Sequence, residues 1–84
     1  MTEDAETKLQ DIVRAALELP PDADVTRARQ PGIASWDSLA HVSLMLGIES
    51  EFGVSIAVAD QLHLTSYPAI RSYLEEHGVG RAVR

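Results

Sequence analysis

Residues 36–53 read WDSLAHVSLMLGIESEFG, and their apolar residues recur at spacings of three and four, which predicts a helix over residues 38–52. Two apolar stripes can be drawn on this helix. The first stripe consists of Leu44, Met45, Ile48 and Phe52, and the second consists of Leu39, Val42 and Leu46. Because a helix needs only one stripe to face a core, we expect the first stripe to pack inside and Leu39 and Val42 to stay exposed. For Leu46, burial in the core remains an open alternative.

The segments around this helix predict an all-α fold. Residues 8–19, KLQDIVRAALEL, carry one apolar stripe and predict a helix over about 4–18, which Pro20 and Pro21 end. Residues 20–36 form a long loop, which Val25 and Ile33 could pin to the core. We expect residues 54–56 to be a connection and a short helix to follow near 57–63.

The last predicted helix spans residues 66–77, SYPAIRSYLEEH, with Ser66 as its N-cap and Gly78 after its end. The residues expected to face inward are Tyr67, Ile70, Tyr73 and Leu74. This order of elements predicts a small four-helix bundle with a long loop between its first two helices. We expect a single domain over residues 1–84, with an ordered core over about 5–77 and a frayed tail over 78–84.

Composition and charge restrict the classes of function. The chain has 84 residues, a formal net charge of -6 and no cysteine. Nucleic-acid phosphates repel an acidic chain, so we expect no DNA or RNA partner, whereas a partner with a basic patch is favoured. No apolar run approaches the ~20 residues of a membrane span, and no signal peptide is visible. We therefore expect a monomer in the cytoplasm.

The sequence offers little support for catalysis. His41, His63 and His77 are scattered rather than spaced as metal ligands, so we expect no metal site. A Ser-His-Asp triad could be drawn from Ser38, Asp37 and a histidine, but Asp37 adjoins Ser38 and nothing supplies an oxyanion hole. We predict no catalytic residues and a protein that is not an enzyme.

Ser38 can be interpreted in two ways. On local sequence alone, Asp37 or Ser38 is a helix cap that accepts a hydrogen bond from the first turn. Alternatively, the Ser38 hydroxyl is an exposed attachment point, where a phosphate would meet unpaired N–H groups and the positive end of the helix dipole. The two interpretations are compatible if Asp37 is the cap and Ser38 is modified.

The wider pattern resembles the acyl carrier protein family, which includes peptidyl carrier domains, over roughly residues 5–77. The motif Asp37-Ser38-Leu39 opens the second helix, as the Asp-Ser-Leu signature does in that family. The other residues that follow the family's pattern are Val42, Leu44, Ile48, Glu49, Glu51, Phe52, Gly53 and Ile56. The resemblance implies that Ser38 carries 4'-phosphopantetheine through a phosphodiester, and that Asp37 helps to position the chemistry of the modifying enzyme.

A carrier of this kind implies a definite set of partners. A phosphopantetheinyl transferase would modify Ser38, a ligase would load an acyl or aminoacyl group, and downstream synthases or transferases would use it. The sequence leaves open whether the chain is an acyl carrier or an aminoacyl or peptidyl carrier loaded by an adenylating ligase. An alternative from another class is a helical interaction module without a prosthetic group, in which Ser38 is only a cap.

Four departures from the family concern the surface around Ser38. Ser35 stands where many members have glycine, and Trp36 stands where they have a small residue. Trp36 could contact a partner or shield the arm, or it could anchor the loop. Ala40 and Ser43 replace frequently acidic residues, which favours a specialised lipid or secondary-metabolite pathway. We expect the docking surface for partner enzymes to comprise Leu39, Val42, Leu46 and Trp36.

Overall fold

Four α-helices form a small helical bundle in residues 1–79, the part of the chain that this computed structural model describes. They are α1 (Glu3–Ala16), α2 (Ser38–Phe52), α3 (Val58–Gln61) and α4 (Tyr67–Glu76), with one 3-10 turn at Gln30–Gly32. Strands are absent from these residues, where an isolated bridge pairs Arg29 with Ser66. The predicted all-α fold is thereby confirmed.

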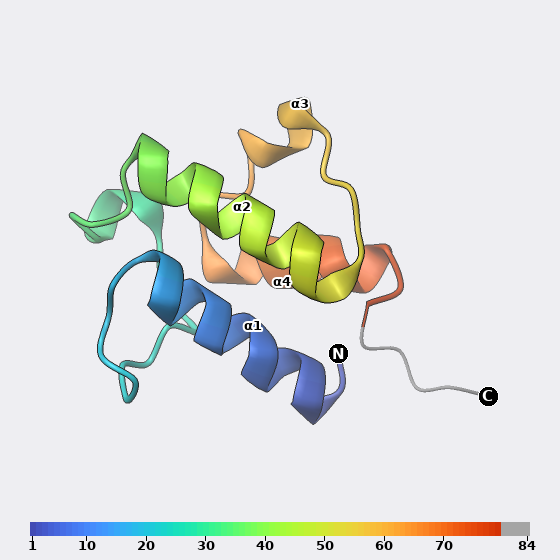
Figure 1. The fold of residues 1–84 in the computed structure, drawn as a ribbon, viewed down its shortest axis with the longest axis horizontal. Helices are drawn as coiled ribbons and strands as arrows, with labels where there is room; N and C mark the ends of the chain where they lie inside the picture. Colours follow the sequence, from blue (N-terminus) through green and yellow to red (C-terminus); the bar gives the residue numbers. More distant parts are fainter. Residues whose placement is uncertain (80–84) are drawn as a thin grey trace.

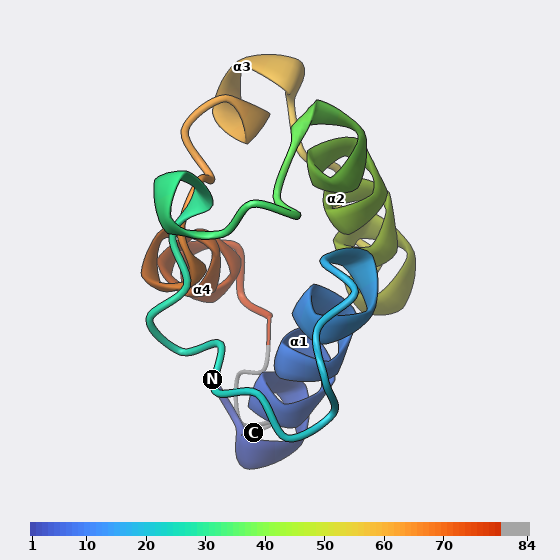
Figure 2. The ribbon, with the colours of Figure 1, turned by 90° about the vertical axis from the view of Figure 1, so that its left-hand side faces the viewer.

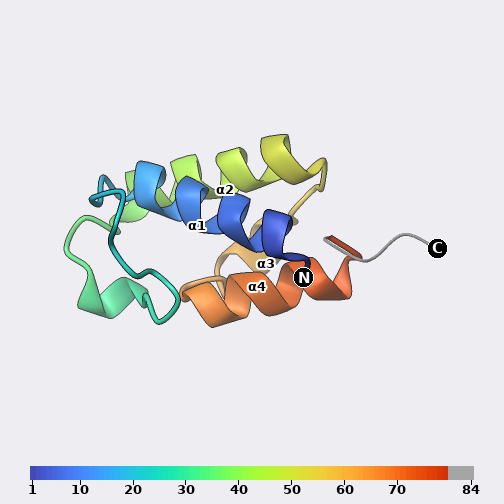
Figure 3. The ribbon, with the colours of Figure 1, turned by 90° about the horizontal axis from the view of Figure 1, so that it is seen from below.

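The three longer helices run side by side. α1 and α2 run in opposite directions, and the long loop joins them at the end where α2 begins (Figure 1). Turned by 90°, the view shows α1, α2 and α4 around a common interior, with α3 above them (Figure 2). From below, α4 lies beside α1, and the loop covers the same end of all three helices (Figure 3).

α1 ends earlier than predicted. The Thr2 hydroxyl caps its start by accepting a hydrogen bond from the Ala5 N–H at 3.2 Å. At the other end, Glu18 takes a left-handed conformation with φ 56°, and the Leu19 N–H donates to the Arg14 carbonyl at 2.8 Å. This C-terminal turn ends the helix at Ala16. Our prediction that this helix ends at about residue 18 was wrong. The prediction used Pro20 and Pro21 as the stop signal, but a proline sets only the last position that a helix can reach. The turn at Glu18 ends α1 sooner.

Aliphatic side chains make up most of the core. The fully buried ones come from α1 and the turn after it, the long loop, α2 and α4, and include Leu9, Val13, Leu17, Val25, Leu44, Met45, Ile48, Ile70 and Leu74. The predicted inner stripe of α2 is confirmed except for Phe52, which is half-buried. Gly47 allows α1 and α2 to pack closely. A β-carbon at this position would lie 3.2 Å from Ile12 Cγ2 on α1, which is closer than an ordinary van der Waals contact. Because Phe52 keeps contact with solvent, its truncation should cost less than the ~3–5 kcal/mol typical of a buried phenylalanine.

The long loop is held against the start of α4. Val25 is buried and Ile33 packs partly against the core, as the sequence predicts. The Tyr67 N–H donates to the Ala28 carbonyl at 2.8 Å, and the Gln30 N–H donates to the Thr65 carbonyl at 2.9 Å. These backbone bonds give the loop a defined path to Ser38.

Contacts with the bundle extend beyond the predicted limits of the core at both ends. The Met1 amino group donates to Glu75 Oε2 at 2.7 Å. Gly78 has φ 80°, and the Val79 N–H that follows donates to the Leu74 carbonyl at 2.9 Å. Val79 also packs against the core. The predicted tail was therefore wrong for residues 78–79, and its remainder, 80–84, lies outside the described residues.

An ionic cluster connects α1 with α4. Glu6 Oε2 accepts hydrogen bonds from Arg71 Nε at 2.9 Å and from the Tyr67 hydroxyl at 3.0 Å. The bond from Arg71 is the main reason why the pKa of Glu6 lies below its usual range. Burial raises the pKa of Tyr67 to about 12. The lowered pKa keeps Glu6 charged at neutral pH, and the raised pKa keeps Tyr67 uncharged.

The lowered pKa of Glu6 predicts a specific pH dependence of stability. The charged carboxylate stabilises the folded state above the unfolded-state pKa of about 4.3, and this contribution disappears as the pH falls through the lower folded-state pKa. Glu6→Gln should therefore reduce the free energy of unfolding by about 0.5–1 kcal/mol at pH 7, and the difference from wild type should shrink near pH 3. Urea denaturation at both pH values measures this, and a difference independent of pH would contradict it.

Candidate modification site at the start of α2

Asp37, and not Ser38, is the cap of α2. Its backbone is extended, Oδ1 accepts a hydrogen bond from the Ala40 N–H at 2.9 Å, and its carbonyl accepts the His41 N–H at 2.9 Å. Ser38 is the first residue of the helix and is exposed. Within residues 1–79 its hydroxyl makes no hydrogen bond, and neither its own N–H nor that of Leu39 has a partner. The capping role is filled, so the Ser38 hydroxyl is free for other chemistry.

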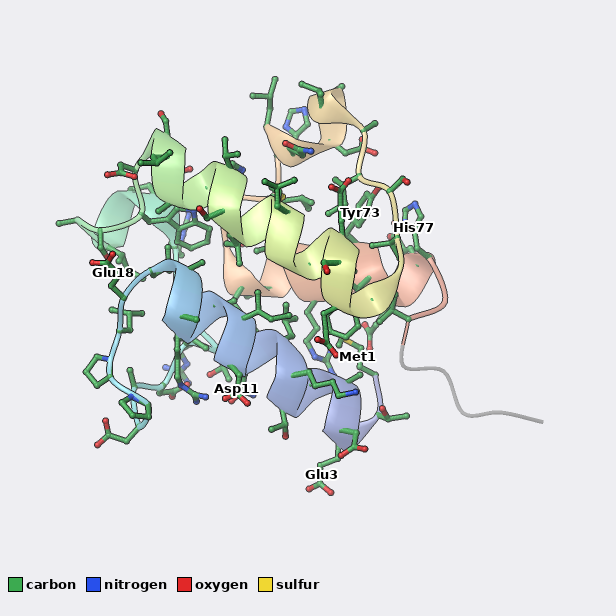
Figure 4. The ribbon with its side chains drawn as sticks, in the orientation of Figure 1. Met1, Glu3, Asp11, Glu18, Tyr73 and His77 are labelled. Carbon is green, nitrogen blue, oxygen red and sulfur yellow. The ribbon has the colours of Figure 1, made fainter. Side chains whose placement is uncertain are left out.

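His41 does not activate Ser38, although it lies one helical turn away. Its Nδ1 accepts a hydrogen bond from Trp36 Nε1 at 3.0 Å, so the proton is on Nε2, which lies 2.8 Å from the Gln61 carbonyl oxygen. Both ring nitrogens are thus engaged, and neither can accept a proton from Ser38. His77 stacks on Tyr73 with ring centroids 4.0 Å apart, at the end of the molecule opposite Glu18 and the start of α2 (Figure 4).

Trp36 is part of the core. Its side chain is 3% exposed, and its ring stacks on that of His41. The prediction that placed Trp36 on the docking surface was therefore wrong, and its alternative, a loop anchor, is the one observed. Single-sequence reasoning could not separate the two, since the acceptor of the indole N–H lies five residues further along, on α2.

An apolar surface surrounds Ser38 on α2 and α3. The exposed fractions are 77% for Leu39, 51% for Val42, 60% for Leu46, 75% for Val58 and 71% for Leu62. The predicted exposure of Leu39 and Val42 is confirmed, and the structure places Leu46 with them rather than in the core. Val58 and Leu62 were missed by the sequence analysis, although their spacing of four residues is the signal that would have paired them on one face.

The acidic side chains of α2 bond to other parts of the protein. Glu49 Oε2 accepts the Ile56 N–H at 2.7 Å, which holds the chain after the helix, and Glu51 lies 3.6 Å from Lys8 Nζ. The first turn of α2 contains no acidic residue. Apart from the exposed Asp37 cap, the surface of α2 beside Ser38 is therefore apolar rather than acidic.

Two hollows flank the start of α2. One, of about 300 Å³, includes Ser38, His41 and Val42 of α2 together with residues of α3. The other, of about 320 Å³, includes Asp37, Leu39 and Ala40 together with the end of α1. A third hollow, of about 350 Å³, lies against the start of α4 and includes Arg27 and Arg29 but not Ser38.

Comparison with known protein families finds no matching family model, and comparison with curated proteins finds no match either. Within residues 1–79, no three histidine or acidic side chains gather as a metal site would need. None of the helices described there is both long and apolar enough to cross a bilayer. The case for a function therefore depends on the geometry around Ser38.

Proposed function

We propose that this protein is a carrier whose Ser38 bears 4'-phosphopantetheine and presents cargo to separate enzymes. The observation that carries the proposal is the exposed, unbonded hydroxyl of Ser38 at a helix start that Asp37 already caps. The free N–H groups of Ser38 and Leu39 would face a phosphate attached there, where the helix dipole favours negative charge. The residues present fit the group, because a phosphodiester at Ser38 displaces no existing contact.

The attachment chemistry uses groups from two proteins. A bond forms between Ser38 Oγ and the phosphorus that bears pantetheine, the pyrophosphate bond of coenzyme A breaks, and adenosine 3',5'-bisphosphate leaves. Because both nitrogens of His41 are engaged, His41 does not take the hydroxyl proton, and we propose that a group of the transferase takes it. When bound, the arm supplies the thiol that this cysteine-free chain lacks and holds acyl or aminoacyl cargo as a thioester.

Intact mass spectrometry tests the proposal directly. The protein is coexpressed with a broad-specificity phosphopantetheinyl transferase, or incubated with one and coenzyme A. One phosphopantetheinyl group should be added. A wild-type protein that stays unmodified with several transferases would instead support a helical interaction module, which the exposed apolar surface alone would also suit.

The apolar surface predicts how the transferase recognises the carrier. Leu39→Asp should slow modification of Ser38 by about tenfold or more, because a central apolar contact is typically worth at least 1–2 kcal/mol of binding. The melting temperature should stay near that of wild type, since Leu39 is 77% exposed and an acidic residue suits the first turn of a helix. Single-turnover modification rates and thermal denaturation measure the two effects.

The control for this prediction introduces the same charge elsewhere. Ser72 is exposed on α4, and Ser72→Asp should leave the rate of modification unchanged. Unfolding by Leu39→Asp would identify Leu39 as a core residue, and an equal slowing in both variants would point to net charge rather than apolar contact.

A further inference from the structure

A hollow at the start of α4 carries positive charge. It has a volume of about 350 Å³ and lies where the long loop passes that helix (Figure 3). The residues that line it are Arg27, Arg29, Pro31, Thr65, Ser66 and Pro68. Among the described residues, no acidic side chain belongs to this wall. We call it the arginine hollow, and its charge is opposite in sign to the formal net charge of the chain, -6.

Arg27 and Arg29 have no ion pair within residues 1–79. Both side chains are exposed, and Ala28 between them is buried, so the two arginines point away from the core. Asp24, whose pKa is lowered chiefly by hydrogen bonds from Thr26 and in part by the charge of Arg27, does not line the hollow. The other basic side chains in this part of the chain are paired: Lys8 with Glu51, Arg14 with Asp11, and Arg71 with Glu6 and Glu75.

Backbone pairing fixes the position of the arginine hollow. Arg29 lies opposite Ser66 in an isolated antiparallel bridge, and backbone hydrogen bonds of 2.9 Å and 2.8 Å flank the pair. In this pattern the two opposed residues do not bond to each other, and their side chains lie close together on one face. The base of the Arg29 side chain is therefore held beside Ser66, the cap of α4, where the positive end of the helix dipole adds to its charge.

The free donors of the arginine hollow belong to side chains. In the first turn of α4, the backbone N–H groups are bonded within the protein or, at Pro68, absent. By contrast, the guanidinium groups of Arg27 and Arg29 and the hydroxyl of Thr65 make no hydrogen bond within residues 1–79. Guanidinium groups bind carboxylates through paired N–H donors, and Pro31 and Pro68 supply apolar walls for the methylene groups behind a carboxylate. This composition fits an aspartate or glutamate side chain.

The arginine hollow adjoins the surface around Ser38. Thr65 lines both the arginine hollow and the hollow on the α3 side of Ser38, so an enzyme that covers the apolar surface there also reaches the arginines. The net charge of -6 repels small free anions. An acidic side chain of an enzyme already held by Leu39 and Val42 acts instead at a high effective concentration. A carboxylate of a protein partner is therefore the favoured occupant.

We infer that the arginine hollow binds an aspartate or glutamate side chain of the transferase that modifies Ser38. The inference rests on the proposed function. It gives the docked transferase two contacts of different kinds, an apolar one along α2 and a charged one at the start of α4, and two separated contacts fix an orientation that one contact leaves free. The charged contact needs an acidic patch on the transferase, opposite in sign to the basic patch that the net charge of the chain favours.

Charge reversal at Arg29 tests this inference. Arg29→Glu should lower kcat/KM for modification of the carrier by about threefold to tenfold, because an attractive charge pair becomes repulsive, and kcat at saturating carrier should stay unchanged. Arg29→Lys keeps the charge but not the paired donors, so its kcat/KM should lie between those of wild type and Arg29→Glu. Lys8→Glu makes the same charge change at an exposed position of α1 and should leave kcat/KM near that of wild type. Thermal denaturation verifies that each variant is folded.

The outcomes separate this inference from the proposed function. If wild type gains no mass, the proposed function fails, and with it the transferase as occupant. If wild type is modified by several transferases but Arg29→Glu reacts as fast as wild type or faster, or Lys8→Glu is slowed equally, the inference is overturned and the carrier function stands.

A titration without any transferase tests the chemistry of the hollow itself. Sodium acetate is added to the apo protein at constant ionic strength, and the side-chain Nε–H signals of the arginines are followed by NMR. The signals of Arg27 and Arg29 should shift more than that of Arg71, whose Nε–H already donates to Glu6 at 2.9 Å. Equal shifts at all three arginines would reject the hollow as a carboxylate site and overturn the inference.

Discussion

Replacing Ser38 by alanine is expected to abolish attachment of phosphopantetheine completely, because the variant has no Oγ to form the bond to phosphorus. The fold should remain, with a free energy of unfolding within about 0.5 kcal/mol of wild type. The reason is that Asp37 makes the capping bond, from the Ala40 N–H to Oδ1 at 2.9 Å, and Ser38 makes none. Intact mass after incubation with coenzyme A and a transferase, together with urea denaturation, measures both quantities.

Ser43→Ala is the matched control for this result. Ser43 is also exposed on α2, five residues further along, and lies outside the Asp37-Ser38-Leu39 motif. The Ser43→Ala variant should gain the same mass as wild type. A mass gain in Ser38→Ala would place the attachment on another residue, and a large loss of stability in that variant would show that Ser38 shares the capping role.

Leu44→Asp should unfold the domain. Leu44 is fully buried on the inner face of α2. Loss of a buried leucine side chain costs about 2–5 kcal/mol, and burial of an unpaired carboxylate adds to that cost. Since whole domains are stable by only about 5–15 kcal/mol, we expect loss of the helical far-ultraviolet circular dichroism spectrum and of a cooperative melting transition.

Leu46→Asp makes the same chemical change two residues later on the same helix. Leu46 is 60% exposed, so its replacement should keep the helical spectrum and a melting temperature near that of wild type. The contrast between the two variants tests the assignment of the two faces of α2. If both unfold, the outer face also belongs to a core or an obligate interface; if neither unfolds, the inner face is misassigned.

Local sequence signals determined the most accurate predictions. The boundaries of α2 agree with the predicted residues 38–52, because a capping side chain at Asp37 or Ser38, apolar residues at spacings of three and four and a glycine at the end mark them within one segment. The start of α4 is likewise confirmed, with the Ser66 hydroxyl accepting the Ala69 N–H at 3.2 Å. Each of these signals acts over a few residues, so the sequence alone contains it.

Other features depend on contacts between distant segments. The early end of α1 depends on a backbone conformation at Glu18 that glycine would have signalled and glutamate did not. Val79 contacts the bundle through a backbone bond to Leu74 and through packing against the core. A single sequence contains no record of such contacts, so the predicted limits of α1 and of the tail were wrong.

The candidate site shows the same division. The sequence by itself determined the Asp37-Ser38-Leu39 motif at a helix start and the presence of two apolar stripes on that helix, because composition and period are local properties. The structure decided which of two adjacent residues makes the local cap bond, and only the tertiary packing decided that Trp36 is buried against His41 and that Val58 and Leu62 extend the exposed surface. The physical reason is that burial and hydrogen-bond partners depend on where the loop and α3 lie in space, and long-range packing sets those positions.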